Sequence, residues 1–121
     1  MKSRIMVVED STELRESYAN HLEALGFEVV QAADGMEALA LAKAQPPDGV
    51  VLDIALPKLD GFYVAELWRR DGAMARVPVI AVSSYTDGDY EGRALRSGCT
   101  AALRKPCTPD ELTGTLQRFL R

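Results

Sequence analysis

The chain is poor in the residues that build disulfide frameworks and soft-metal sites, because its 121 residues include two cysteines and one histidine. Cys99 and Cys107 have neither the spacing of metal ligands nor that of a redox pair, so we interpret them as reduced thiols. His21 falls in the middle of a predicted helix, where a helix-flank residue is the simpler interpretation. These scarcities exclude a disulfide framework and a site of clustered cysteine and histidine ligands.

Long apolar runs and an excess of positive charge are also missing. No apolar stretch approaches the ~18 residues of a membrane span. The N-terminus reaches the acidic pair Glu9-Asp10 too early for a signal peptide. The net charge of −4 argues against nonspecific nucleic-acid binding. We therefore expect a soluble, cytoplasmic protein with no direct nucleic-acid or membrane partner.

The chain does contain a regular alternation of short apolar runs and helix-like segments, in a length that suits one domain over residues 1–121. The candidate strands are residues 5–8, 27–32, 49–52, 77–82 and 101–103, and the candidate helices are residues 12–25, 36–44, 61–70, 90–97 and a last segment from 109. The strand candidates are continuously apolar, which is typical of parallel strands covered by helices on both faces. This pattern predicts a doubly wound α/β domain with five parallel strands and five helices.

The last two helices carry different signals. Thr108, Pro109 and Glu111 supply a cap, a proline at the first helical position and a capping-box acid. The helix predicted over residues 90–97 contains Gly92, which weakens it. We expect this fourth helix to move more easily than the others.

Polar side chains follow four of the five predicted strands, at one edge of the predicted sheet. They are Glu9 and Asp10, Asp53, Ser83 and Ser84, and Lys105. A helix cap, a turn or a solvated side chain explains any one of them alone. Their coincidence at a single edge favours a functional site.

The chemistry of this set is that of phosphoryl transfer. Converging carboxylates repel one another unless one has a raised pKa or a cation lies between them. Oxygen ligands without histidine or cysteine suit Mg²⁺. Asp53 is a competent phosphoryl acceptor, Lys105 offers positive charge to phosphoryl oxygens, and Ser83 offers a hydrogen bond.

The sequence resembles the receiver domains of response regulators, of the chemotaxis-regulator type in two-component signalling, over essentially its whole length. Asp53 and the following residues to Gly61 resemble the family's Asp-x-x-x-Pro-x-x-Asp-Gly segment, and Lys105-Pro106 resembles its final Lys-Pro pair. The resemblance implies a flavodoxin-like fold with strand order 2-1-3-4-5 and a cis Lys105–Pro106 bond. It implies a switch that catalyses at most its own phosphorylation and dephosphorylation.

The resemblance also implies roles and partners. Asp53 would accept a phosphoryl group from a sensor histidine kinase or a histidine phosphotransfer protein, and the chain would act on a downstream protein as a monomer or a phosphorylation-dependent dimer. The implied Mg²⁺ ligands are Glu9, Asp10, Asp53 and the backbone carbonyl of Ala55, and the implied phosphoryl contacts are Ser83 and Lys105.

The main departure from the family is Ala102, where receiver domains usually have a tyrosine or phenylalanine that moves inward on activation. We hypothesise that the signal passes instead through residues 84–89 and the helix that follows, using Tyr85 or Tyr90. The alternative function is a phosphorylation-independent protein-interaction module. An aspartyl-phosphate hydrolase is disfavoured because Ala55 stands where its second aspartate would be.

Overall fold

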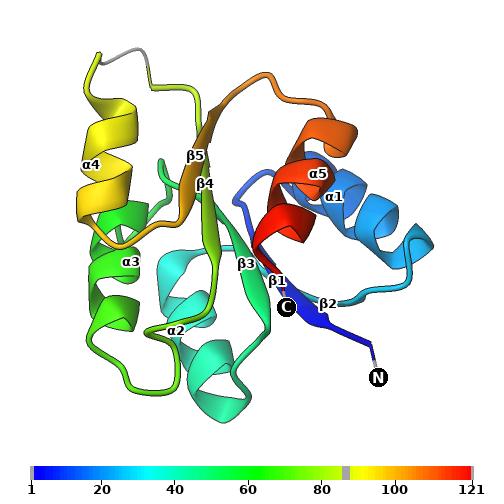
Figure 1. The fold of residues 1–121 in the computed structure, drawn as a ribbon, viewed down its shortest axis with the longest axis horizontal. Coiled ribbons are helices and arrows are strands. Elements are labelled where there is room, and N and C mark those ends of the chain that lie inside the picture. The colour runs from blue at the N-terminus through cyan, green and yellow to red at the C-terminus, as the bar shows by residue number, and fades with distance from the viewer. Residues whose placement is uncertain (1, 86–87, 121) are drawn as a thin grey trace.

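A computed structural model of the chain describes residues 2–85 and 88–120 (Figure 1). Five parallel strands lie in the order β2-β1-β3-β4-β5 in this part of the chain, as the resemblance implies. The strands are β1 (Arg4–Val8), β2 (Glu28–Ala32), β3 (Gly49–Asp53), β4 (Val79–Ser83) and β5 (Ala101–Arg104). The helices are α1 (Thr12–Ala24), α2 (Gly35–Ala44), α3 (Gly61–Arg69), α4 (Tyr90–Arg96) and α5 (Pro109–Phe119).

The helices cover both faces of the sheet. Figure 1 shows α1 and α5 together on one side and α2, α3 and α4 on the other. Successive β1 residues contact opposite layers, since Ile5 and Val7 pack with α1 and α5 while Met6 and Val8 pack with the other layer. A strand buried on both faces requires apolar residues at every position. The continuous apolar runs are therefore explained, and the prediction of a doubly wound fold is confirmed.

Side-chain caps fix where four of the helices begin. The side chains of Ser11, Asp34, Asp60 and Thr108 each accept a hydrogen bond from a backbone N–H in the first turn of α1, α2, α3 and α5. Helix α4 spans seven residues, and the Asp89 carboxylate at its start pairs with Arg96 instead of capping the helix. Helix α4 is therefore short and starts without a side-chain cap, while its weakening by Gly92 stays a prediction.

Gly61 allows α3 to begin against the end of β3. A Cβ atom at this position would lie 2.7 Å from both the Asp53 carbonyl oxygen and the Ile54 Cα. The Gly61 N–H donates to the Ile54 carbonyl at 2.9 Å. The glycine of the Asp-Gly pair is thus required by a close backbone approach beside the candidate phosphoacceptor.

The predicted boundaries differ from the structure by one or two residues. β4 begins at Val79 rather than residue 77, and it extends to Ser83. Pro78, just before it, has no N–H for the ladder, although its carbonyl accepts from Val50. Within residues 2–85 and 88–120, no helix has the length and apolar character needed to cross a membrane.

Candidate functional site

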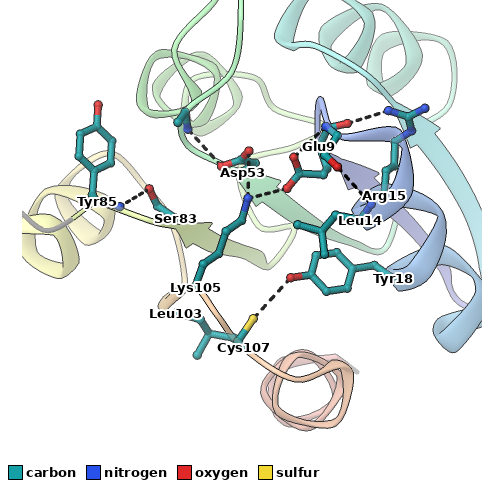
Figure 2. Close-up of polar contacts among 12 residues, drawn as sticks. Glu9, Leu14, Arg15, Tyr18, Asp53, Ser83, Tyr85, Leu103, Lys105 and Cys107 are labelled. Atoms are coloured by element: carbon teal, nitrogen blue, oxygen red, sulfur yellow. Dashed lines mark hydrogen bonds and ion pairs between the residues drawn. The ribbon is translucent and has the colours of Figure 1, made fainter.

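Four strand ends bring the predicted site residues to one edge of the sheet (Figure 2). Asp53 and Ser83 are the last residues of β3 and β4, and both are buried. Glu9 follows β1 and is buried, and Lys105 follows β5. Asp10 lies at the same edge and is exposed. The predicted juxtaposition of these residues is therefore found, while their chemical roles stay predictions.

The Lys105 ammonium lies between two carboxylates. Its Nζ is 2.8 Å from Glu9 Oε1 and 3.4 Å from Asp53 Oδ2 (Figure 2). The closer partner is Glu9, the acid that follows β1, rather than the candidate phosphoacceptor Asp53. One positive charge thus offsets part of the repulsion between two buried acids.

Glu9 is fixed by hydrogen bonds at both its side chain and its backbone. Oε2 accepts from the Ser11 N–H at 3.0 Å, and the Glu9 carbonyl accepts from Arg15 Nη1 at 2.8 Å. Arg15 also donates from Nε to Gln31 Oε1 at 3.1 Å. Sequence reasoning missed Arg15, because a long side chain on the first turns of a helix carries no local signal of what it reaches.

Asp53 is positioned by the start of the loop after β3. Its Oδ1 accepts from the Ala55 N–H at 3.2 Å. Carboxylate oxygens of Glu9, Asp10 and Asp53 lie within 4.8 Å of one another. This all-oxygen donor set fits a hard cation such as Mg²⁺.

Burial and charge separate the proton affinities of the two buried acids. Burial, reinforced by the negative charge of Glu9, raises the pKa of Asp53 from 3.8 to about 7 despite the opposing effect of Lys105. Burial acts to raise the pKa of Glu9 as well, but hydrogen bonds from Lys105 and Ser11 outweigh it and lower that pKa below its ordinary value. Of the two buried acids, Asp53 is therefore the one whose carboxyl holds a proton more readily.

Ser83 connects the site to the segment after β4. Its Oγ accepts from the Tyr85 N–H at 3.1 Å. A hollow of about 340 Å³ is lined by Ala55, Ser83, Ser84 and Tyr85. The Lys105–Pro106 peptide bond is cis, as the resemblance implies. Part of the segment proposed to relay the signal, residues 86–87, lies outside the described residues.

A five-stranded doubly wound sheet with an acidic cluster and a lysine at its carboxyl edge defines a receiver-type signalling domain. The chain belongs to the family of response regulator receiver domains, which it matches over residues 5–117. It is therefore a receiver domain of two-component signalling, and this family acts as a signalling switch.

Two relatives and two solved structures illustrate the similarity. The probable transcriptional regulator ycf27 of Porphyridium aerugineum is 34% identical over 99% of this chain, which spans 49% of that protein. The polar-differentiation response regulator DivK of Brucella anthropi is 32% identical over 99% of this chain and 98% of its own length.

The chemotaxis response regulator CheY4 of Vibrio cholerae superposes with a TM-score of 0.93 at 31% identity, covering 99% of this chain and all of its own. The receiver domain of sensor histidine kinase PA1611 from Pseudomonas aeruginosa has a TM-score of 0.88 at 32% identity, with 98% of both chains covered. Its structure has a magnesium ion coordinated in the active site cleft.

Proposed function

We propose that this receiver domain is a phosphoacceptor switch whose acceptor is Asp53. The observation that carries the proposal is the buried Asp53 carboxylate at the end of β3, beside Lys105 and within one cluster with two further acids. A carboxylate in this setting is shielded from water and faces a fixed positive charge. Both features favour formation of an aspartyl phosphate over loss of the phosphoryl group to solvent.

The proposed cofactor is Mg²⁺. Its ligands would be the carboxylates of Glu9, Asp10 and Asp53 together with the Ala55 backbone carbonyl. When bound, the ion supplies positive charge that offsets the repulsion between Asp53 and an incoming phosphoryl group. The all-oxygen cluster and the magnesium in the PA1611 receiver domain support this proposal.

The proposed reaction is an in-line transfer. An Asp53 carboxylate oxygen forms a bond to phosphorus while the bond from phosphorus to a histidine nitrogen of the donor breaks, and that nitrogen retains the electron pair. Lys105 would turn from Glu9 toward the phosphoryl oxygens, and the Ser83 hydroxyl would donate a hydrogen bond to one of them. The Ser83 oxygen already accepts a hydrogen bond, so its proton is available for this purpose.

The proposed partners are a sensor histidine kinase or histidine phosphotransfer protein and a downstream protein, all in the cytoplasm. Phosphorylation would change the surface that the downstream protein binds. The similarity to DivK and CheY4, both named as response regulators, supports this arrangement. Catalysis would be limited to the chain's own phosphorylation and dephosphorylation.

The test is intact-mass spectrometry after incubation with acetyl phosphate and Mg²⁺. We expect one phosphoryl adduct on the wild-type chain and on the matched control Asp71→Asn, which replaces an exposed acid. Asp53→Asn should form no adduct. A persistent adduct on Asp53→Asn would overturn the assignment, and a folded wild type that never forms one would favour the phosphorylation-independent interaction module.

A further inference from the structure

Arg104, the last residue of β5, joins β5 to the segment after β4 and to α4. Its Nη1 donates to the Tyr85 carbonyl at 2.7 Å, and its Nε contacts Glu91 Oε1 at 2.8 Å. Its guanidinium carbon lies 5.3 Å from the centre of the Tyr90 ring. We call these three contacts the Arg104 brace. Arg104 therefore makes contacts to three residues outside its own strand, which a solvent-exposed arginine at the end of a strand need not make.

The brace holds one side of Tyr85 while the candidate phosphoryl site holds the other. The Tyr85 N–H donates to Ser83 Oγ, and the Tyr85 carbonyl accepts from Arg104. Ser83 is fully buried, and it ends the strand next to the one that carries Asp53. A displacement of the Ser83 side chain therefore acts directly on the backbone of Tyr85.

The Tyr85 side chain is half-exposed and rests between two other rings. Its ring centre is 6.1 Å from that of Phe62 and 6.4 Å from that of Tyr90. Tyr90 is buried, and its hydroxyl donates to the Leu103 carbonyl at 2.8 Å. Tyr90 is thus anchored to β5, whereas Tyr85 is 38% exposed and its side chain is not buried in the core.

We propose that Arg104 is a positioning residue of the switch: the Arg104 brace stabilises the unphosphorylated arrangement of Tyr85 and must open when Ser83 turns to a phosphoryl group on Asp53. This inference rests on the proposed function, because it concerns the event that follows phosphorylation. If Ser83 turns, the Tyr85 N–H must follow it or lose its acceptor. The Tyr85 carbonyl is bonded to Arg104, so the backbone can follow only if that bond breaks.

The inference has a thermodynamic consequence. A contact that stabilises the unphosphorylated arrangement lowers the affinity for any ligand that favours the other arrangement, by the same factor. Removal of the brace should therefore tighten binding of beryllofluoride, a non-covalent mimic of the phosphoryl group. A purely structural arginine would leave this affinity unchanged or weaken it.

The first experiment measures beryllofluoride affinity with Mg²⁺ present for four proteins. We expect Arg104→Ala to bind about fivefold tighter or more than wild type, the lower range of typical allosteric couplings. Arg104→Lys should fall between the two, since it keeps the charge but loses the fixed fork geometry. Arg118→Ala, which removes an exposed arginine on α5, should match wild type. Equal or weaker binding by folded Arg104→Ala would overturn the inference.

The second experiment examines the Arg104→Ala variant without metal or phosphoryl mimic and uses beryllofluoride-bound wild type only as the reference for the active arrangement. Labelling with 3-fluorotyrosine gives ¹⁹F signals from four tyrosines, and Tyr85→Phe assigns one of them. We expect the Tyr85 signal of apo Arg104→Ala to lie closer to its position in beryllofluoride-bound wild type. The signal of Tyr63, an exposed residue on α3, should stay in place. An unmoved Tyr85 signal in folded Arg104→Ala would contradict the inference.

The outcomes separate this inference from the proposed function. If wild type forms the aspartyl-phosphate adduct but the Tyr85 signal of Arg104→Ala stays at its apo wild-type position, the role of Arg104 is overturned and phosphorylation of Asp53 stands. A wild-type chain that forms no adduct would overturn the proposed function itself. If Arg104→Ala fails to fold, Glu91→Gln weakens the brace from α4 and should tighten beryllofluoride binding in the same direction by a smaller factor. Unchanged binding by Glu91→Gln would then count against the brace.

Discussion

Burial of the Asp53 carboxylate near the negative charge of Glu9 predicts that Asp53→Asn stabilises the protein when no metal is bound. Burial raises the pKa of this carboxyl from 3.8 to about 7, so the native state prefers the protonated acid. As pH rises through this interval the unfolded state loses its proton first, and the native state loses stability relative to it. At about 1.36 kcal/mol per pH unit, the loss approaches about 4 kcal/mol by neutral pH.

The Asp53→Asn side chain carries no charge at any pH. The free energy of unfolding of this variant should therefore exceed that of wild type only slightly near about pH 4, and by about 2–4 kcal/mol near about pH 8. Urea denaturation followed by the fluorescence of Trp68, the chain's single tryptophan and a buried one, measures this difference. Asp71→Asn is the matched control and should show no growing advantage.

Mg²⁺ should reduce the difference in stability between Asp53→Asn and wild type. A cation that binds the native acidic cluster stabilises wild type in proportion to its occupancy, whereas Asp53→Asn lacks one of the proposed ligands. The stability gap should therefore narrow as Mg²⁺ is added at neutral pH. A gap that is flat between about pH 4 and about pH 8, or a wild type more stable than Asp53→Asn without metal, would refute the reasoning.

Three further predictions concern packing and local structure. Thr108→Ala removes the N-cap of α5 and should cost about 1 kcal/mol in urea unfolding, with Thr108→Ser close to wild type. Gly61→Ala should cost about 1–3 kcal/mol and reduce the phosphoryl adduct, because the new Cβ meets the backbone of Asp53; unchanged stability would contradict the close approach. Burial raises the pKa of Cys99 to about 12, so a thiol reagent should modify Cys107 in the native protein and reach Cys99 only on unfolding.

The sequence predicts the edge of the sheet at which the site lies, because strand ends in a doubly wound sheet follow a general rule. Asp53 and Ser83 end their strands, and both lie where that rule requires. Which side chains at this edge form ion pairs with one another is not predictable in the same way. Lys105 contacts Glu9 across 96 positions of sequence, and the choice between two neighbouring acids depends on distances of less than an ångström.

Long side chains explain most of what sequence reasoning missed. Arg15 and Arg104 each reach several groups on other elements, and a guanidinium at the end of a flexible chain leaves no periodic pattern behind it. Tyr85 and Tyr90, which the sequence could not distinguish, also have different environments in the structure. Tyr90 is buried and bonded to β5, whereas Tyr85 is half-exposed, a difference that depends on how α4 packs rather than on either residue's type.

The absence of an aromatic on β5 leads to a last prediction about the packing between α4 and β5. Ala102 packs against the core cluster that contains Tyr90, and the Tyr90 hydroxyl bonds to the carbonyl of the next β5 residue. A large ring at position 102 would therefore compete with the Tyr90 ring for the same space. We expect the effect of a substitution at one of these two positions to depend on the size of the side chain at the other.

Ala102→Tyr should destabilise the protein by about 1–3 kcal/mol through overpacking, and Tyr90→Ala by about 3–5 kcal/mol through the cavity it leaves. The double variant should be more stable than the sum of the two changes predicts, by about 1 kcal/mol or more. A double-mutant cycle in urea measures this coupling directly. Additive effects would mean that a tyrosine at position 102 does not contact Tyr90, and the predicted coupling would be wrong.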